Sequence, residues 1–230
     1  MNWTDQDVEQ APSFAAGPVG EVWMDEAILN RVRGCAVGAA IGDALGMPLE
    51  FGPRQPAEHL VREMQAGRIP AGTFTDDTEM ALAVAESLVA HSPLDARDLA
   101  QRFVSWYRAG PDDVGNHTRA VLTRIASGRP WQEATQSVQA AQPDSAGNGS
   151  VMRCWPVAIA HWDDMTQLLG DSRLQSQITH AHRECMEGSA LVNATIYYLL
   201  RGTLPAEAMA RAASQVELGG ALQGVLKAAV

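Results

Sequence analysis

The spacing of the apolar residues constrains this chain most, because it is helical in most segments and alternating in none. From about residue 25, apolar side chains recur every three or four positions, as in the series Ile28, Leu29, Val32, Cys35, Ala36, Ala39, Ala40 and Ala44. No segment shows the period of two that is typical of a strand, and alanine is abundant whereas β-branched residues are sparse. The sequence therefore predicts an all-α fold with short loops.

The same periodicity predicts the positions of the helices. They are expected at about 25–46, 78–91, 93–108, 116–127, 131–142, 166–182, 184–201 and 205–230, with a short one near 56–67 and a buried apolar segment at 151–160. Residues 1–23 have no steady period and are expected to form a flexible N-terminal tail. Residues 24–230 are long enough for a single domain with a sizeable core.

Composition excludes several classes of function. The net charge is −10, lysine occurs once and the arginines are scattered, so no nucleic-acid surface is expected. No stretch reaches the roughly 20 apolar residues of a membrane helix, and no signal peptide is evident at the N-terminus. The three cysteines are widely spaced, which is typical of reduced thiols in a cytoplasmic protein. The oligomeric state stays open.

The run Thr75-Asp76-Asp77-Thr78-Glu79 concentrates oxygen donors at the start of an apolar helix. One interpretation is a helix cap, in which the carboxylates and the two threonines cap the helix and favour its dipole, because Asp76 and Glu79 have the D-x-x-E spacing of a capping signature. The other is a site for a hard divalent cation, because two adjacent carboxylates repel each other and a cation would relieve the repulsion. The residues alone leave both interpretations open.

Three further features have a structural and a functional interpretation. Glycines at 34, 38, 42 and 46 form a ridge along one predicted helix, which favours close packing of another helix or of a ligand. The loop containing Ser145, Gly147, Asn148, Gly149, Ser150 and Met152 is either a turn or a cradle for phosphate and ribose. His180, in Thr179-His180-Ala181-His182, is either a structural residue near a helix end or a ligand contact.

These segments occur in an order that resembles the ADP-ribosylglycohydrolase family, of the dinitrogenase-reductase-activating and ADP-ribosyl-acceptor hydrolase type. The matching stretches are 33–50, 74–78, 145–153 and 178–180, within about residues 30 to 202. The resemblance implies a compact orthogonal multi-helix bundle with two Mg²⁺ or Mn²⁺ ions. It also implies hydrolytic removal of ADP-ribose from a modified protein side chain or a small conjugate.

The resemblance assigns roles to particular residues. Thr75, Asp76 and Asp77 would be metal ligands, and Glu50 would lie at the catalytic centre. The loop residues Ser145, Gly147, Asn148, Gly149, Ser150 and Met152 would bind the diphosphate and the proximal ribose, with His180 near the ADP-ribose. An oxocarbenium-like transition state at the anomeric carbon would be stabilised by such carboxylates.

The chain departs from the family pattern near its C-terminus. The family's second metal motif, D-x-D followed by Thr or Ser, is missing after residue 180, and the only D-x-D is Asp5-Gln6-Asp7. The sequence also stops within an apolar, helix-like run at 221–230, as expected of a fragment. The second metal site is therefore in doubt. A catalytically impaired module that binds ADP-ribose or a nucleotide, or an interaction protein on the same fold, remains an alternative to the hydrolase.

Overall fold

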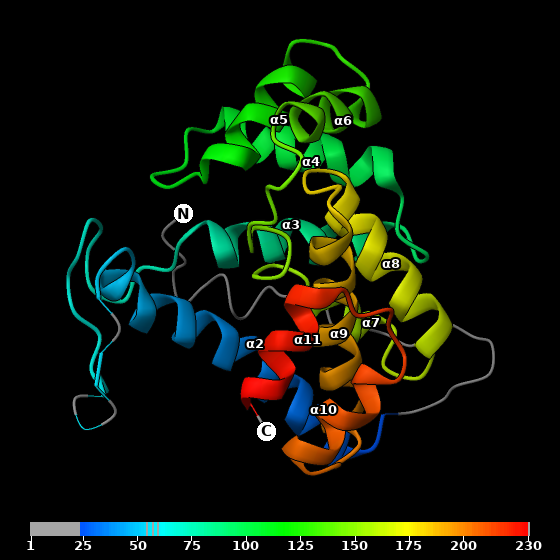
Figure 1. The fold of residues 1–230 in the computed structure, drawn as a ribbon. Helices are drawn as coiled ribbons and strands as arrows, with labels where there is room; N and C mark the ends of the chain where they lie inside the picture. The colour runs from blue at the N-terminus through cyan, green and yellow to red at the C-terminus, as the bar shows by residue number, and fades with distance from the viewer. Residues whose placement is uncertain (1–23, 54, 57, 59, 230) are drawn as a thin grey trace.

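The computed structural model describes residues 24–229 except 54, 57 and 59, so the expected tail at 1–23 lies outside the described residues. In the described part the chain is helical and contains no strand, which confirms the all-α prediction (Figure 1). No helix in this part is both long and apolar enough to cross a membrane. Its helices, in chain order, are α2 (Glu26–Gly46), η1 (Met47–Leu49), α3 (Asp76–Ala90), α4 (Ala96–Arg108), α5 (Asn116–Ala126), α6 (Trp131–Ala141), α7 (Trp155–Ala160), α8 (Met165–Gln177), α9 (Arg183–Leu200), α10 (Pro205–Ala213) and α11 (Gly220–Ala229).

The central helix is α3, which lies between the α4–α5–α6 group and the group formed by α7 to α11 (Figure 1). Its buried side chains Met80, Val84 and Leu88 belong to the main hydrophobic cluster. Leu99 and Phe103 of α4 extend this cluster, and both are fully buried. Burial of these faces fixes the N-terminus of α3 relative to its neighbours, because the apolar area removed from water provides most of the stabilisation.

A second cluster joins α8, α9 and α10. Leu168, Ala194 and Ala212 are fully buried in it and come from these three helices in turn. The two clusters are linked through α7, which packs against both α3 and α9. The loop before α7 is thereby held close to the N-terminal half of α3.

The glycine ridge of α2 has no packing partner in the described part of the chain. A Cβ atom added at Gly34, Gly38 or Gly42 would meet no other heavy atom within 4 Å. Val37 and Ile41, on the same side of the helix, are 57% and 47% exposed. No other described helix therefore packs on the ridge, and ligand binding there stays a prediction.

Three helix predictions were wrong in extent. The short helix predicted near 56–67 does not extend over residues 60–67, where Leu60 is 65% exposed and no helix is formed, although Glu58 has 3-10 helical conformation. The helix predicted at 205–230 is two helices, because α10 ends at Ala213, residues 214–219 are not helical, and α11 begins at Gly220. The helix predicted at 166–182 ends at Gln177, since the carbonyl of Ser176 accepts hydrogen bonds from the N–H groups of both Thr179 and His180.

Candidate active site

The N-terminus of α3 is capped by one of the predicted threonines and not by the predicted Asp76–Glu79 pair. Thr75 is the N-cap, and its hydroxyl accepts the N–H of Asp77 at 3.3 Å. Glu79 instead accepts a hydrogen bond from the indole N–H of Trp106 at 2.6 Å, so it does not close a capping box with Asp76. The capping interpretation therefore holds for Thr75 and is wrong for the Asp76–Glu79 pair.

Asp43, on α2, completes the cap from outside the helix. Its carboxylate accepts the N–H and the hydroxyl of Thr75 at 2.9 and 2.8 Å. It also accepts the N–H and the hydroxyl of Thr78 at 3.1 and 2.7 Å. Because Asp43 and Thr75 satisfy these donors, the side chains of Asp76 and Asp77 are not needed as caps.

Asp76 and Asp77 lie in an environment that disfavours their charged forms. Burial, followed by the charges of Asp113, Glu50 and Asp43, raises the pKa of Asp76 to about 6, although the N–H of Gly115 approaches its carboxylate at 3.4 Å. Burial, followed by the charges of Asp43, Asp76, Glu50 and Asp113, raises the pKa of Asp77 to about 7. Close carboxylates with raised pKa values are characteristic of functional sites.

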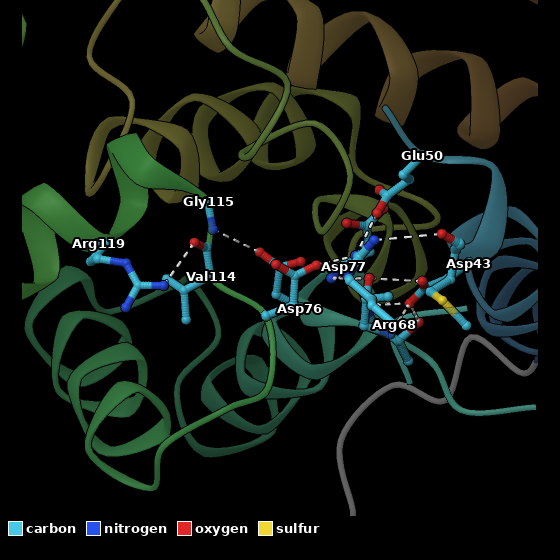
Figure 2. Close-up of polar contacts among 12 residues, drawn as sticks. Asp43, Glu50, Arg68, Asp76, Asp77, Val114, Gly115 and Arg119 are labelled. Carbon is cyan, nitrogen blue, oxygen red and sulfur yellow. Dashed lines mark hydrogen bonds and ion pairs between the residues drawn. The ribbon is translucent and has the colours of Figure 1, made fainter. Parts of the chain in front are cut away.

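Glu50 approaches Asp76 and Asp77 from the side opposite to Gly115 (Figure 2). It follows η1 directly, and its carboxylate pairs with the guanidinium of Arg68 at 2.5 Å. Arg68 also pairs with Asp113, so one cation connects two segments that are far apart in the sequence. The structure therefore brings Glu50, Asp76 and Asp77 into one acidic cluster, with Arg68 as its counter-charge.

The first turn of α5 joins the acidic cluster to the glycine loop. Gly115, the N-cap of α5, donates to Asp76, and Thr118 lies 3.4 Å from the position of a Cβ atom added to Gly149. The same added Cβ would lie 2.8 and 2.9 Å from ring atoms of His180. Gly149 is thus required for the loop to approach His180.

His180 is buried and held in one orientation. Its Nδ1 lies 2.8 Å from the hydroxyl of Thr179, and its ring lies 4.6 Å from that of His117, centroid to centroid. Burial and the nearby charge of Arg153 hold the pKa of His180 well below its usual value, and burial also lowers the pKa of His117. Both rings are therefore neutral at pH 7 and can stack or hydrogen-bond without adding charge.

The loop residues predicted to bind substrate have different environments. Ser145 contacts Nδ1 of His117 at 3.4 Å, Gly147 accepts a hydrogen bond from the thiol of Cys185, and the carbonyl of Asn148 accepts the N–H groups of Val151 and Met152. Ser150 is fully buried, with its hydroxyl 2.8 Å from that of Ser176. Met152 packs against the main core cluster. The loop around Gly147 and Gly149 adjoins His180, whereas the side chain of Ser150 lies in the core.

Arg153, the residue that follows this loop, is the largest fully buried side chain. Its guanidinium donates to the side chain and the carbonyl of Gln175 at 3.1 and 3.0 Å and to the hydroxyl of Thr179 at 2.7 Å. It also lies 4.3 Å from the centroid of the Phe103 ring. Burial lowers the pKa of Arg153 to about 9, so it remains protonated at neutral pH and is a fixed positive charge behind Asp76.

The acidic cluster has the donor chemistry of a hard-cation site. Within the described part of the chain, no three His, Cys, Asp or Glu side chains are arranged as a formed metal site. The hydroxyl of Thr75 and the carboxylates of Asp76 and Asp77 are nevertheless oxygen donors, and the raised pKa values show that a positive charge would be stabilising there. Mg²⁺ and Mn²⁺ prefer such ligands, so these residues fit the expected ions.

Four residues of the site were not predicted: Asp43, Arg68, Asp113 and His117. Asp43 had a signal, since it is a lone acid within a run of small and apolar residues. Arg68, Asp113 and His117 lie in or next to loops and carry no pattern. Only the fold shows that they meet.

Comparisons with a family model and with individual known proteins point to the same family. The family model for ADP-ribosylglycohydrolase matches residues 24–230. The ADP-ribosylarginine hydrolase Tri1 of Pseudomonas putida is 36% identical over 198 residues, which are 81% of this chain and 51% of that protein. The ADP-ribosyl-[dinitrogen reductase] glycohydrolase of Rhodospirillum rubrum is 34% identical over 179 residues, or 75% of this chain and 59% of that protein.

A solved structure is also similar. A chain of an ADP-ribosylglycohydrolase-related protein complex superposes with a TM-score of 0.69 and 34% sequence identity, covering 89% of this chain and 68% of that chain. The present chain spans about half the length of the curated relatives it matches. Because the family model extends over the whole bundle and both site segments, this chain belongs to the ADP-ribosylglycohydrolase family.

Proposed function

We propose that this chain carries the site of a hydrolase that removes ADP-ribose from a modified protein side chain or a small conjugate. The observation that carries the proposal is the acidic cluster: Asp76 and Asp77, with raised pKa values, lie with Glu50 beside a glycine loop and a neutral histidine. The names of the relatives describe hydrolases of ADP-ribosylated arginine and of ADP-ribosylated dinitrogen reductase. A modified protein is therefore the proposed substrate class.

The carboxylates suit the chemistry of glycosidic cleavage. Positive charge develops at the anomeric carbon in the transition state, and nearby carboxylates stabilise it electrostatically. Glu50 is the candidate general acid or base because it is half-exposed and can reach solvent. Arg68 pairs with both Glu50 and Asp113, and this shared guanidinium holds the Glu50 carboxylate near Asp113.

A divalent cation fits the proposal as a cofactor. Thr75, Asp76 and Asp77 would hold it at the N-terminus of α3. When bound, Mg²⁺ or Mn²⁺ supplies a concentrated positive charge that can fix ribose hydroxyls and polarise oxygen atoms. Asp43 would keep the Thr75 hydroxyl oriented in that role, since it accepts the hydroxyl hydrogen at 2.8 Å.

The glycine loop is the proposed contact for the diphosphate and the proximal ribose. Gly147 has no side chain to block approach of a ligand to the backbone N–H groups, and Gly149 lets the His180 ring lie against the same loop. His180 is 3% exposed and neutral, so its contribution would be contact and hydrogen bonding rather than charge neutralisation. Backbone N–H groups and a metal ion would thus bind the anionic ligand, which is consistent with a protein whose net charge is −10.

The test is release of ADP-ribose from an ADP-ribosylated arginine peptide and from an ADP-ribosylated serine peptide. Each is assayed with Mg²⁺, with Mn²⁺ and with a chelator, for the chain as it is and for Asp77→Asn. Release that requires metal and is lost in the variant supports the hydrolase. The matched control for Asp77→Asn is Asp144→Asn, which makes the same change at an exposed acid. Binding of ADP-ribose without release would instead identify a binding module.

A further inference from the structure

A groove lined by arginines lies away from the acidic cluster. The helices that contribute to its lining, α4, α5 and α6, form one group in the fold (Figure 1). The groove runs between the exposed face of α4 and the connection from α5 to α6, with a volume of about 700 Å³. Val104 and Ile125 contribute to its apolar floor, and Trp131 lines one wall. The first residue of the groove on α4 is Arg97 and the last is Arg108.

The charge of this groove is opposite to that of the chain. Arg97, Arg108 and Arg129 line it, and no Asp or Glu is among its lining residues. None of the three arginines forms an ion pair with a described residue, whereas six other arginines of the described chain do. In a protein of net charge −10, three such guanidinium groups around one hollow form a local site for anions.

Local structure explains only part of this arrangement. Arg108 donates to the carbonyl of Ala126 at 2.8 Å, and a cation at the C-terminal end of a helix is favourable. Arg97 is in the first turn of α4, where the helix dipole disfavours a positive charge. It is exposed and forms no side-chain hydrogen bond with a described residue, so no hydrogen bond in the described part of the chain offsets this cost.

The spacing of the arginines selects the kind of anion. Arg97 and Arg108 are eleven positions apart on α4, which corresponds to about 16 Å along the helix axis. A single phosphate is too small to contact both ends. An extended peptide, at about 3.3 Å per residue, spans the same distance with roughly five residues. Arginine forks bind carboxylates in bidentate fashion, and the floor of Val104 and Ile125 suits the apolar atoms of such a peptide.

We infer that this groove between α4 and the α5–α6 connection binds an extended acidic segment of a partner protein. The three arginines would pair with carboxylates along the segment, and Trp131 would cover an apolar side chain between them. The inference does not depend on hydrolysis of ADP-ribose, because it concerns an unmodified peptide and residues outside the acidic cluster. It is therefore testable whether or not the proposed activity is found.

The test is fluorescence anisotropy of a labelled hexaglutamate peptide titrated with the whole chain at low and at moderate salt. The double variant Arg97→Gln/Arg129→Gln removes two groove charges. The matched control, Arg33→Gln/Arg183→Gln, removes two exposed arginines elsewhere with the same change in net charge. A labelled hexaglutamine peptide is the uncharged control. Competition by inorganic phosphate at constant ionic strength tests for a small-anion site.

The groove predicts binding of hexaglutamate that weakens with salt and falls about tenfold in the Arg97/Arg129 variant, with less than about a twofold change in the control. Hexaglutamine should not bind. Equal losses in the two double variants would show non-specific attraction and overturn the inference. Displacement by phosphate at constant ionic strength would show a small-anion site instead, and absence of any hexaglutamate binding would also overturn the inference.

Discussion

The carboxylate of Asp43, on α2, accepts both the backbone N–H and the hydroxyl of Thr75, the residue that begins α3. Two helices that are 29 residues apart in the sequence, residues 47–75, are thereby joined at one side chain. The same carboxylate is one of the charges that raise the pKa of Asp77. Asp43 therefore stabilises the N-terminus of α3 through hydrogen bonds, and its charge also raises the pKa values of Asp76 and Asp77.

Replacing Asp43 tests its role as a cap. Asp43→Ala removes the acceptor for four hydrogen bonds, so the free energy of unfolding should fall by about 2–4 kcal/mol, even though repulsion with Asp77 is relieved. Urea denaturation at pH 7 measures the change. Asp25→Ala is the control, because Asp25 caps α2 through a single exposed bond to Ile28 and should cost about 1 kcal/mol or less. Equal effects in the two variants would show that Asp43 does not organise α3.

Removing the charge of Asp77 should stabilise the metal-free chain in a pH-dependent way. The pKa of Asp77 is raised from 3.8 to about 7 in the folded chain, so ionisation disfavours the folded state as pH rises through about 4 to 7. Asp77→Asn should therefore raise the free energy of unfolding by about 1–3 kcal/mol at pH 8, allowing for partial exposure to solvent, and by much less near pH 4. Urea denaturation with a chelator present, at both pH values, provides the comparison.

The control for this experiment is Asp144→Asn, which changes the same group at an exposed position. It should leave the difference in stability between pH 8 and pH 4 almost unchanged. If Asp77→Asn behaves as this control does, Asp77 does not lie in a repulsive, desolvated environment, and the electrostatic basis of the proposed cation site is lost.

Gly149 should be much less tolerant of alanine than Gly147. An added Cβ at Gly149 would lie 2.8 Å from the buried ring of His180, which is also stacked on His117 and hydrogen-bonded to Thr179. At Gly147 the nearest atom would be 4.0 Å away, an ordinary contact. Gly149→Ala should lower the free energy of unfolding by about 1–3 kcal/mol and weaken ADP-ribose binding, whereas Gly147→Ala should do neither strongly. Thermal unfolding and calorimetric titration measure the two effects, and tolerance of both substitutions would contradict the close contact with His180.

Arg153 should be essential for stability although it forms no ion pair in the described chain. Arg153→Met keeps most of the side-chain volume, but it leaves acceptors of Gln175 and Thr179 unsatisfied in the core. A loss of about 2–4 kcal/mol in the free energy of unfolding is expected. Arg211→Met is the control, because its ion pair with Glu207 is exposed on both sides and should contribute about 1 kcal/mol or less. A smaller loss for Arg153→Met than for Arg211→Met would refute this role.

The helical periodicity was sufficient to predict the fold class, because most helices of this chain bury one regular apolar face. It failed where tertiary contacts decide the local structure. Residues 214–219 separate α10 from α11, because this segment contacts α9 instead of continuing the helix: the N–H of Glu217 donates to the carboxylate of Glu187. Near 56–67, no tertiary surface in the described chain covers the apolar residues of a short helix.

The sequence motifs of the candidate site could be predicted, but the contacts between residues from distant segments could not. Asp76 and Asp77 stand out because adjacent acids begin an apolar helix. Their partner Asp113 could not be found from sequence, since it comes from the loop after α4, where its charge acts on Asp76 and Asp77 and its carboxylate pairs with Arg68. Ser150 shows the opposite error: it belongs to the glycine motif, yet its hydroxyl is hydrogen-bonded in the core. Spacing along a chain indicates which residues are available, whereas packing determines which way they point.

The most direct test of the proposed site is calorimetric titration of ADP-ribose into the chain, with Mg²⁺ and then with chelator. The same titration is made with the double variant Asp76→Asn/Asp77→Asn. The acidic cluster predicts binding that requires Mg²⁺ and is lost in the double variant. Binding of equal strength in the variant, or no binding by the unaltered chain in either condition, would contradict the assignment of the site to the N-terminus of α3.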